Sequence, residues 1–551
     1  MTAIPFPLRS NPAPFKFMGE ARLINAFAEE IGPENKSPIG IIPIPGQTTF
    51  ADFAETGPRG MLMVPELETL FSVHSSTLYE VDDTGTETAL DGIVAGSAPV
   101  IMERGPARFM QSDVTISIAS PAVIGWTNHN LPAGTPIQFA TTGSLPTGLE
   151  AAKTYYVIAA GLTNNSFEVS ATVGGSAVNT SGGQSGTQTA IRGEATYQVV
   201  IVSDDVTYCV EDGHLFFVDL PEPAVSVTYL SGRWIYAAAS GRFYFSELND
   251  ARSVDALSYA TAEARPDGLV RGIADRGELW LFGDTTTEIY TPSDDANAPF
   301  IPLGGSFIDK GCASKMTVVS FDNAPHWLGH DGIIYRGQGY SAERVSSHPV
   351  ERAIAAVADK TTILAYTYLE DGHAFYVLTC PDWTWVFDAA TRAWHERRSY
   401  TRNDWTAWPY AFAFGKHLVG DKASGAIREL KSDAWTENSR PIRVELILPD
   451  IPGEVIFHRL EIDVATGVGL NVISTAGGYD PKLMLSWSDD GGHTYSSERI
   501  ESIGKQGEYY RTVAFTRMGK SKKKGRRYRI AMTDPVVKAL ALGDIQAERV
   551  A

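Results

Sequence analysis

Cysteine is scarce in this sequence. Three residues in 551 are cysteine, at positions 209, 312 and 380. An odd number of widely separated cysteines supports neither a disulfide framework nor a CxxC pair of metal ligands. We therefore expect a chain that folds in a reducing cytoplasm and holds its shape without covalent crosslinks.

Long hydrophobic runs are also missing. No stretch approaches the roughly 18 consecutive apolar residues that a membrane-spanning helix needs. The opening sequence, MTAIPFPLRSNPAPFKF, contains neither the basic segment nor the apolar segment of a secretory signal. We expect a protein that neither inserts into a membrane nor carries a secretory signal.

Positive charge is in short supply. The chain has 46 Lys and Arg against 65 Asp and Glu, which gives a formal net charge of −19. Binding to DNA depends on Lys and Arg contacts to phosphate, so most of this surface cannot hold nucleic acid. An acidic wall would instead repel DNA, as suits a conduit that must not grip what passes through it.

The sequence repeats one local pattern, in which a hydrophobic strand meets a tight turn and an aromatic-rich strand follows. From the third copy onward the interval is roughly 40–50 residues, the length of one β-propeller blade. The length of the chain allows two to four domains. The copies are LFSVHSSTLYEV (70–81), YCVEDGHLFFV (208–218), WIYAAASGRFYF (234–245), LWLFGDTTTEIY (279–290), HWLGHDGIIY (326–335), FYVLTCPDWTWVF (375–387) and LVGDKASGAIREL (418–430).

The long gap between the first two copies contains a segment of different composition. Charged residues nearly vanish between Gln111 and Thr189, and Thr, Ser, Gly, Asn and Ala dominate. Short strand candidates bounded by Gly, Pro or Asn predict a small inserted β-barrel or sandwich at 113–190. Its last part, GGSAVNTSGGQSGTQ (174–188), is typical of a flexible return.

Two further regions complete the prediction. Residues 20–31 (EARLINAFAEEI) fit either a short helix or a strand, and 350–359 (VERAIAAVAD) fits a helix that follows Ser347 and Pro349. From about residue 441 the pattern changes to longer alternating strands, which predict a β-sandwich.

The predicted fold is therefore all-β: a β-propeller-like ring of about seven blades, with an inserted small β-domain and a C-terminal β-sandwich. The blade number stays open between six and eight, because the first unit and an N-terminal strand can close the ring together. We expect an N-terminal extended arm joining the propeller at 1–65, the propeller at 66–112 and 191–440, the inserted barrel or sandwich at 113–190, and the C-terminal sandwich at 441–551.

The sequence SDDGGHTY matches the Asp-box pattern S-x-D-x-G-x-T-aromatic. The pattern predicts a structural hairpin turn, in which the Asp accepts hydrogen bonds from backbone N–H groups and a Gly takes a positive φ. The box occurs in sialidases and in many β-proteins without activity, and no pair of catalytic carboxylates stands out in this chain. The matching residues are Ser488, Asp490, Gly492, Thr494 and Tyr495.

The sequence RMGKSKKKGRRYR (517–529) holds eight basic residues and no acid. It is either a contact with DNA or an acidic partner, or a solvated hairpin that balances local charge. The residues are Arg517, Lys520, Lys522, Lys523, Lys524, Arg526, Arg527 and Arg529.

Five tryptophans between positions 383 and 408 also have two interpretations. They form blade cores or protomer interfaces, or they are platforms that stack on sugars. We find no sequence pattern for catalysis, for a metal site or for a cofactor, and we expect a protein that is not an enzyme.

Two stretches resemble the packaged-DNA stabilisation proteins, or tail hubs, of short-tailed bacteriophages (podoviruses). Near the N-terminus the resemblance rests on Arg22, Asn25 and Phe27, then Gly32, Lys36, Pro45-Gly46, Phe53 and Arg59-Gly60-Met61. Near the C-terminus it rests on LSWSDDGGHTY (485–495), GKQGEY (504–509) and YRIAMTDPVVKALALG (528–543). The inserted segment looks like the small β-modules found in many phage tail proteins, and it is a departure from the simplest members.

The resemblance implies a structural virion protein that is assembled in the host cytoplasm. Copies would form a homo-oligomeric, hexameric ring, the tail nozzle, below the portal and adaptor proteins of the head–tail connector. This ring would close the DNA exit channel, retain the packaged double-stranded DNA until DNA ejection, and support a tail needle or fibre and tailspikes. No cofactor is implied.

Two other functions stay open from the sequence. The Asp-box and the tryptophans suggest a propeller that binds or cleaves glycans. The insert suggests a receptor-binding tail protein.

Overall fold

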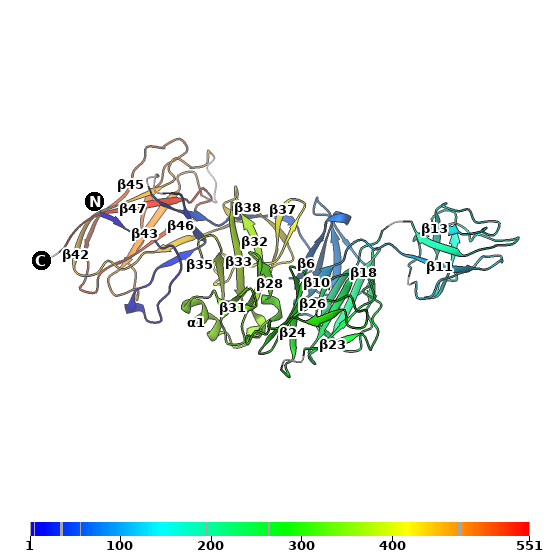
Figure 1. The fold of residues 1–551 in the computed structure, drawn as a ribbon. Coiled ribbons are helices and arrows are strands. Elements are labelled where there is room, and N and C mark those ends of the chain that lie inside the picture. The colour runs from blue at the N-terminus through cyan, green and yellow to red at the C-terminus, as the bar shows by residue number, and fades with distance from the viewer. Residues whose placement is uncertain are drawn as a thin grey trace.

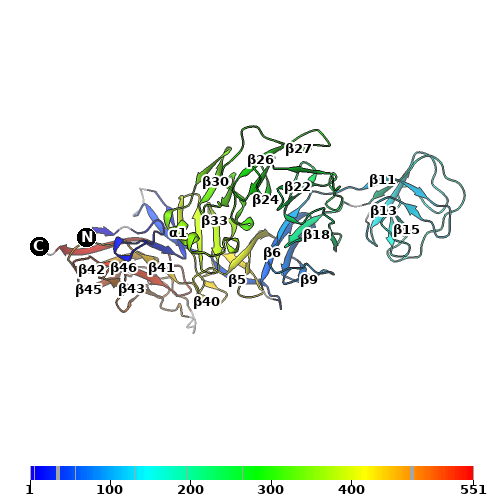
Figure 2. The same cartoon turned by 90° about the horizontal axis from the view of Figure 1, so that it is seen from below.

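The structure, a computed structural model, describes residues 2–4, 6–32, 37–55, 57–129, 131–193, 195–262, 265–471 and 477–549. Figures 1 and 2 show an elongated molecule in which a β-sandwich carries both chain ends, a β-propeller follows, and a small barrel stands apart at the other end. The chain is almost entirely β-structure, as the sequence predicted.

Within the described residues, seven blades of four strands each follow one another around the propeller: five are separate four-stranded sheets, the sixth is part of a nine-stranded sheet and the seventh is part of a six-stranded sheet. The blades are β6–β9 (Pro58–Val64, Thr69–His74, Thr77–Val81, Glu87–Ala89); β10 and β17–β19 (Ile101–Arg104, Val199–Ser203, Val206–Glu211, His214–Phe217); β20–β23 (Ala224–Leu230, Arg233–Ala238, Arg242–Phe245, Tyr259–Thr261); β24–β27 (Leu269–Asp275, Glu278–Gly283, Thr287–Pro292, Phe300–Pro302); β28–β31 (Val319–Phe321, Ala324–Leu328, Ile334–Gln338, Ser341–Arg344); β32–β35 (Leu364–Glu370, His373–Cys380, Trp383–Asp388, Ala393–Glu396); and β36–β38 (Ala407–Ala413, Lys416–Asp421, Ile427–Lys431) with β5 (Gly46–Ala51).

Each of the seven repeated hairpins lies in a different blade. Six of them are the second and third strands of their blades, such as β25 and β26 in the fourth. In the second blade the repeat falls instead on the third and fourth strands, β18 and β19. The inserted segment enters that blade between its first strand, β10, and its second strand, β17.

The seventh blade is completed by a strand from far away in the sequence. Strand β5 pairs antiparallel with β38, with Gly46 opposite Lys431 and Gln47 opposite Leu430. The short strand β39 (Thr436–Glu437) adds to the other side of β5 and pairs with β40 (Arg440–Pro441). The last blade therefore combines β5, which precedes the first blade in the sequence, with β36–β38 from the end of the propeller. This closes the ring and leaves few free strand edges around it.

Large aromatic side chains fill the spaces between blades. Trp234, Trp280 and Trp327 occupy the second strands of three successive blades, and each is at most 1% exposed. Trp280 and Trp327 share one hydrophobic cluster that joins the fourth and fifth blades. Burying such rings is a main source of stability for a sheet assembly that has no single central core.

The predicted helix is present as α1 (His348–Ala356), between the fifth and sixth blades. Pro349 lies in its first turn, where a missing N–H costs nothing. Ser347 is the N-cap residue, but its hydroxyl makes no capping hydrogen bond. Short 3-10 turns occur at η1 (Lys16–Met18), η2 (Pro65–Leu67), η3 (Lys315–Thr317) and η4 (Lys360–Thr362).

Two sheets form the sandwich around one apolar core. The first sheet has the order β3-β4-β47-β42-β45, with β1 paired to β47, and the second has the order β2-β41-β46-β43-β44. The strands are β1 (Thr2–Ile4), β2 (Arg22–Ile24), β3 (Ala26–Glu30), β4 (Ile39–Pro43), β41 (Val444–Ile447), β42 (Val455–Val464), β43 (Lys482–Ser488), β44 (Arg499–Ser502), β45 (Val513–Lys520), β46 (Arg527–Met532) and β47 (Leu540–Arg549).

The N-terminal region differs from the extended arm predicted at 1–65. Its described residues supply four strands to the sandwich, one to the seventh blade and the first strand of the first blade. The helical alternative for 20–31 is wrong, since β2 and β3 occupy that range. Strand β2 finds its sheet partners hundreds of residues away, in β35 and β41, whereas β3 pairs with the nearby β4.

A continuous sheet joins the sandwich to the propeller. Strand β2 pairs parallel to β35 of the sixth blade and antiparallel to β41, which makes one sheet of nine strands. The Arg22 guanidinium binds Glu396 through two hydrogen bonds across this joint, one of them 2.8 Å from Nε to Oε1. The pairing of Ile24 with Glu396 and the Arg22–Glu396 ion pair hold the sandwich against the sixth blade.

The inserted segment forms a closed barrel with the strand order β11-β12-β15-β14-β13-β16. The strands are β11 (Gln111–Ile116), β12 (Ile124–Gly125), β13 (Pro136–Thr141), β14 (Tyr155–Ile158), β15 (Ser166–Ser170) and β16 (Gln188–Arg192). The return at 174–188, predicted to be flexible, is instead tied to the barrel by backbone hydrogen bonds, including those between Thr147 and Ser181 and between Ser144 and Ser185.

Candidate functional site

Two antiparallel chain segments, residues 105–110 and 195–198, carry the barrel away from the propeller (Figure 1). Arg108 and Thr196 exchange both backbone hydrogen bonds across these two legs, and the Gly105 N–H donates to the Gln198 carbonyl. The legs therefore form a short ribbon rather than two independent linkers.

A cluster of ion pairs fixes the base of this ribbon to the propeller, and it centres on Glu211 at the end of β18. The Glu211 side chain is 1% exposed and faces three guanidinium groups. Arg252 Nη2 lies 2.9 Å from Oε2, while Arg108 Nη1 and Arg192 Nη1 lie 3.3 and 3.6 Å from Oε1. The Gln198 amide also donates to Glu211, at 3.1 Å.

The same arginines have further acidic partners. Arg192, at the end of β16, also pairs with Asp212, and Arg108 Nη2 lies 2.5 Å from Asp250. The cluster, which we call the Glu211 cluster, thus links the barrel, both legs and the second and third blades. Sequence reasoning missed it, although charged residues flanking an almost uncharged insert were a signal for it.

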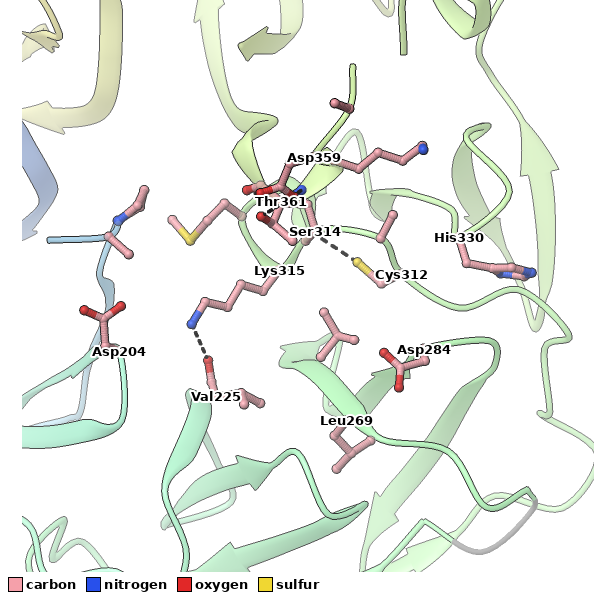
Figure 3. A pocket seen from close by; sticks show the side chains of 17 residues that line it. Asp204, Val225, Leu269, Asp284, Cys312, Ser314, Lys315, His330, Asp359 and Thr361 are labelled. Carbon is pink, nitrogen blue, oxygen red and sulfur yellow. Dashed lines mark hydrogen bonds between the residues drawn. The ribbon is translucent and has the colours of Figure 1, made fainter. Parts of the chain in front are cut away.

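A cavity of about 690 Å³ opens at one end of the propeller axis (Figure 3). The cavity is lined by loops that lead into the first, innermost strand of several blades. Turns between the second and third strands of blades complete the lining. Lys315 points into it and donates to the Val225 carbonyl at 3.4 Å. Asp204 lies to one side of this lysine and Asp284 to the other.

Burial dominates the electrostatics of this cavity. It lowers the pKa of Lys315, and the nearby positive charge of Arg271 lowers it further. It raises the pKa of Asp284, as does the negative charge of Asp267. Asp359 is occupied by capping η4, where it accepts from the Thr361 N–H at 2.9 Å. The cavity therefore offers Lys315 as its best placed donor.

The basic run 517–529 splits into two groups. Arg517, Lys520, Lys522, Lys523 and Lys524 are exposed on β45 and in the turn that follows it. Lys520 pairs with Glu454. The turn lies beside the end of β47, which Figures 1 and 2 place at the end of the sandwich away from the propeller.

The arginines at the other end of the run are held inside the sandwich. Arg526 makes a two-point contact with Asp489, at 2.7 and 2.8 Å, and Arg527 does the same with Asp450, at 2.7 and 2.9 Å. Their side chains are 2% and 0% exposed. Arg529 donates to Ser486 and lies over the Tyr495 ring. Arg526 and Arg527 therefore have no free surface to offer to DNA or to a partner.

The Asp-box residues form a compact turn after β43. Asp490 accepts from the Ser488 hydroxyl at 2.7 Å, from the backbone N–H groups of His493 and Thr494 at 2.9 Å, and from the Thr494 hydroxyl at 2.6 Å. Gly492 has a φ of +90° and donates to Ser488. These hydrogen bonds, that from Ser488 first, hold the pKa of Asp490 well below its ordinary range.

Replacing Asp490 with alanine should lower the free energy of unfolding at pH 7 by about 0.5–2 kcal/mol, the range measured for lost capping side chains. The depressed pKa means that the native state favours the ionised carboxylate. Its stabilisation is complete above the unfolded-state pKa of about 4 and is lost as the pH falls through the lower native value. Urea unfolding at pH 7 and at pH 2.5 checks this, with Asp52→Ala at an exposed carboxylate as control. An equal loss at both pH values would contradict it.

The five tryptophans lie in blade cores. Trp385 and Trp394 belong to the cluster between the fifth and sixth blades, and Trp405 and Trp408 to the cluster between the sixth and seventh. These four side chains are at most 5% exposed, and Trp383 packs against the first of these clusters. The four buried rings provide no platform for stacking on a sugar, and Trp383 is half-buried.

In the described ranges, no group of three or more His, Cys, Asp and Glu side chains is arranged to hold a metal ion. None of the helices described has the length and apolar character of a membrane crossing.

Comparison with known families decides the identity of the chain. Residues 140–435 match the protein-family model described as bacteriophage P22 Gp10, beta-propeller. Residues 448–548 match the model described as bacteriophage P22 Gp10, beta-sandwich. The chain belongs to the bacteriophage P22 Gp10 family. No curated protein matches the chain.

Family membership agrees with the resemblance found in the sequence, and it makes the chain a structural protein of a phage tail. Its place is therefore in the virion, together with other tail components. The propeller match begins within the barrel and omits the first blade and β5, so the strand that closes the ring lies outside the matched residues.

Proposed function

We propose that this member of the P22 Gp10 family is the tail hub, or nozzle, of a short-tailed phage. Copies form a ring of six below the portal and adaptor proteins, close the DNA exit channel, and retain the packaged DNA until ejection. The ring also supports the tail needle and tailspikes, and it assembles in the host cytoplasm. The observation that carries this proposal is the match of both the propeller and the sandwich to the one family.

Two physical features support a mechanical plug. The continuous sheet between the sixth blade and the sandwich makes each protomer stiff, so a closed symmetric ring can resist pressure without deforming. The net charge of −19 gives an acidic surface that lets DNA slide rather than stick. Retention then depends on affinity between proteins and needs no chemical reaction.

Heads that have packaged DNA but lack this chain test the proposal. They should release DNA to an added nuclease, and adding the purified chain should protect it. Protection that fails although the chain binds to the connector would contradict the retention role.

The proposed function requires no catalysis by the Asp-box. We assign its residues to a structural turn: Ser488, Asp490, Gly492, Thr494 and Tyr495.

For the exposed basic turn we propose a contact with DNA or with an acidic partner through Lys522, Lys523 and Lys524. The binding constant K for duplex DNA falls as salt rises. Replacing all three lysines with glutamine should make the slope of log K against log salt shallower by about 0.9 for each phosphate that is no longer neutralised, up to about 3 in total. Equilibrium binding over a salt series measures it, with Lys431→Gln as control. An unchanged slope together with unchanged binding to the connector would rule out both contacts.

A second function, receptor binding, is favoured by the barrel's position on its ribbon away from the propeller (Figures 1 and 2). Because Arg108 and Thr196 are paired, replacing residues 109–195 with Asn-Gly should close the two legs in a tight hairpin turn. We expect particles with this variant to assemble and retain DNA but to lose adsorption to host cells. Normal adsorption would exclude receptor binding by the barrel.

A further inference from the structure

A second, smaller cavity lies on the axis of the propeller. Its volume is about 160 Å³, and its lining comes from the innermost strands of several blades, including Gly60 and Met102, Tyr366 and Tyr410. Lys315 and Met316 line both this axial cavity and the larger one in Figure 3. The two cavities therefore lie on either side of the segment that carries Lys315 and Met316.

Arg271 projects into this cavity because of a local irregularity in its strand. The pairing of β24 with β25 shifts register between Leu269 and Arg271. Bulges of this kind re-aim a side chain. Similar shifts occur near the start of β6, β20 and β36, where the residues that follow are Gly60, Ser226 and Tyr410. The fourth blade thus places a cation where these blades have uncharged residues.

Part of the hydrogen-bonding capacity of Arg271 is not used within the described part of the chain. Its Nε and Nη1 atoms are buried and have no hydrogen-bond partner among the described residues. Arg271 as a whole is half-buried, but leaving two buried guanidinium donors unpaired is costly, because their hydrogen bonds to water are not replaced. Such donors point to a partner that is not part of the polypeptide.

Lys315 is a second incompletely paired cation in the same cavity. Its 3.4 Å contact with Val225 uses one of three ammonium donors, and no carboxylate of the described residues forms an ion pair with it. Burial lowers the pKa of Arg271 to about 10. The acid whose charge acts on Arg271 is Glu103, but the two form no ion pair within the described part of the chain, and burial raises the pKa of Glu103 to about 7.

We propose that the axial cavity binds a small inorganic oxyanion, of the phosphate or sulfate class, between Arg271 and Lys315. A guanidinium offers paired N–H donors that match two oxygens of such an ion, and an ammonium adds a point charge. The volume is about five times the roughly 30 Å³ that one water occupies, so a tetrahedral oxyanion fits. The bound ion cancels the repulsion between the two cations and ties the fourth blade to the start of the fifth.

The test is thermal unfolding of the full chain, followed by tryptophan fluorescence at constant pH and ionic strength. Replacing chloride with sulfate or phosphate should raise Tm by a few degrees and the rise should saturate, since an ion that binds only the native state stabilises it. Arg271→Gln and Lys315→Met should abolish the rise, whereas Lys360→Gln, at the rim of the larger cavity, should keep it. No saturable rise in the unmodified chain, or an equal rise in both axial variants, would overturn the proposal.

Crystals grown with sodium selenate locate the ion independently of any variant. We expect an anomalous selenium peak within hydrogen-bonding distance of Arg271 and Lys315. Anomalous peaks elsewhere on the chain and none in the axial cavity would overturn the site, even if the sulfate-dependent rise in Tm were observed. Because this readout uses the unmodified chain, it holds even if an axial variant fails to fold.

Discussion

Replacing Gly46 with alanine is expected to lower the free energy of unfolding by about 3 kcal/mol, the upper end of the usual cost of overpacking. Gly46 begins β5, and a Cβ atom there would lie 2.4 Å from the Ala434 oxygen and 2.5 Å from its carbonyl carbon. These are backbone atoms of the turn that follows β38, so no side chain can move aside. The substitution must push β5 away from the seventh blade and weaken ring closure.

Gly304→Ala is the matched control. A Cβ atom added at Gly304 would meet no atom within 4 Å, and the residue does not need a positive φ. The control should be neutral or stabilising by about 0.4–1 kcal/mol, because alanine reduces the entropy of the unfolded chain. Urea unfolding of both variants measures the difference. If Gly46→Ala were as stable as Gly304→Ala, the closure of the ring by β5 would be refuted.

Neutralising Glu211 is expected to have a comparable effect. Glu211→Gln removes the one carboxylate that three guanidinium groups share, and Asp212 and Asp250 alone cannot balance their charge. Breaking a buried ion pair by removing one partner costs about 3–5 kcal/mol, because the remaining charges stay buried. The loss should appear in the stability of the second and third blades and as a looser attachment of the barrel.

Glu150→Gln provides the contrast for this experiment. Glu150 pairs with Lys153 in the barrel, but the two side chains are 71% and 45% exposed. An exposed pair is worth about 0–1 kcal/mol, so this variant should unfold almost like the original chain. Denaturant unfolding gives the free energy of unfolding of each variant. Small-angle X-ray scattering shows whether the barrel samples a wider range of orientations relative to the propeller. Equal stability of the two variants would mean that the Glu211 cluster does not hold the barrel.

The parts of the fold that were predictable are those encoded locally. Each propeller hairpin has its two aromatic strands and its turn within about a dozen residues, so sequence alone shows it, as the spacing of β25 and β26 illustrates. The sandwich strands β42 and β43 were also evident from alternation. The strands β2 and β5 were not, because their partners β35, β41 and β38 lie hundreds of residues away. Strand β3 pairs with the nearby β4, but its segment 20–31 fitted a helix as well as a strand.

The same limit applies to the candidate sites. The run 517–529 was found as a block of charge, but only the fold shows that Asp489 and Asp450 bury Arg526 and Arg527. Lys522–Lys524 stay exposed because they fall in the turn. Arg271 and Lys315 carried no sequence signal at all, since a bulge in β24 and the packing of η3 bring them to the same cavity.

The most direct measurement is cryo-electron microscopy of tails assembled from this chain and the portal–adaptor complex. The account predicts a ring of six copies around the DNA exit channel, each with its propeller and sandwich in the rigid arrangement of Figure 1 and with its barrel directed away from the propeller. Density that places the chain outside the channel, or a chain that stays monomeric beside an intact connector, would contradict the hub function.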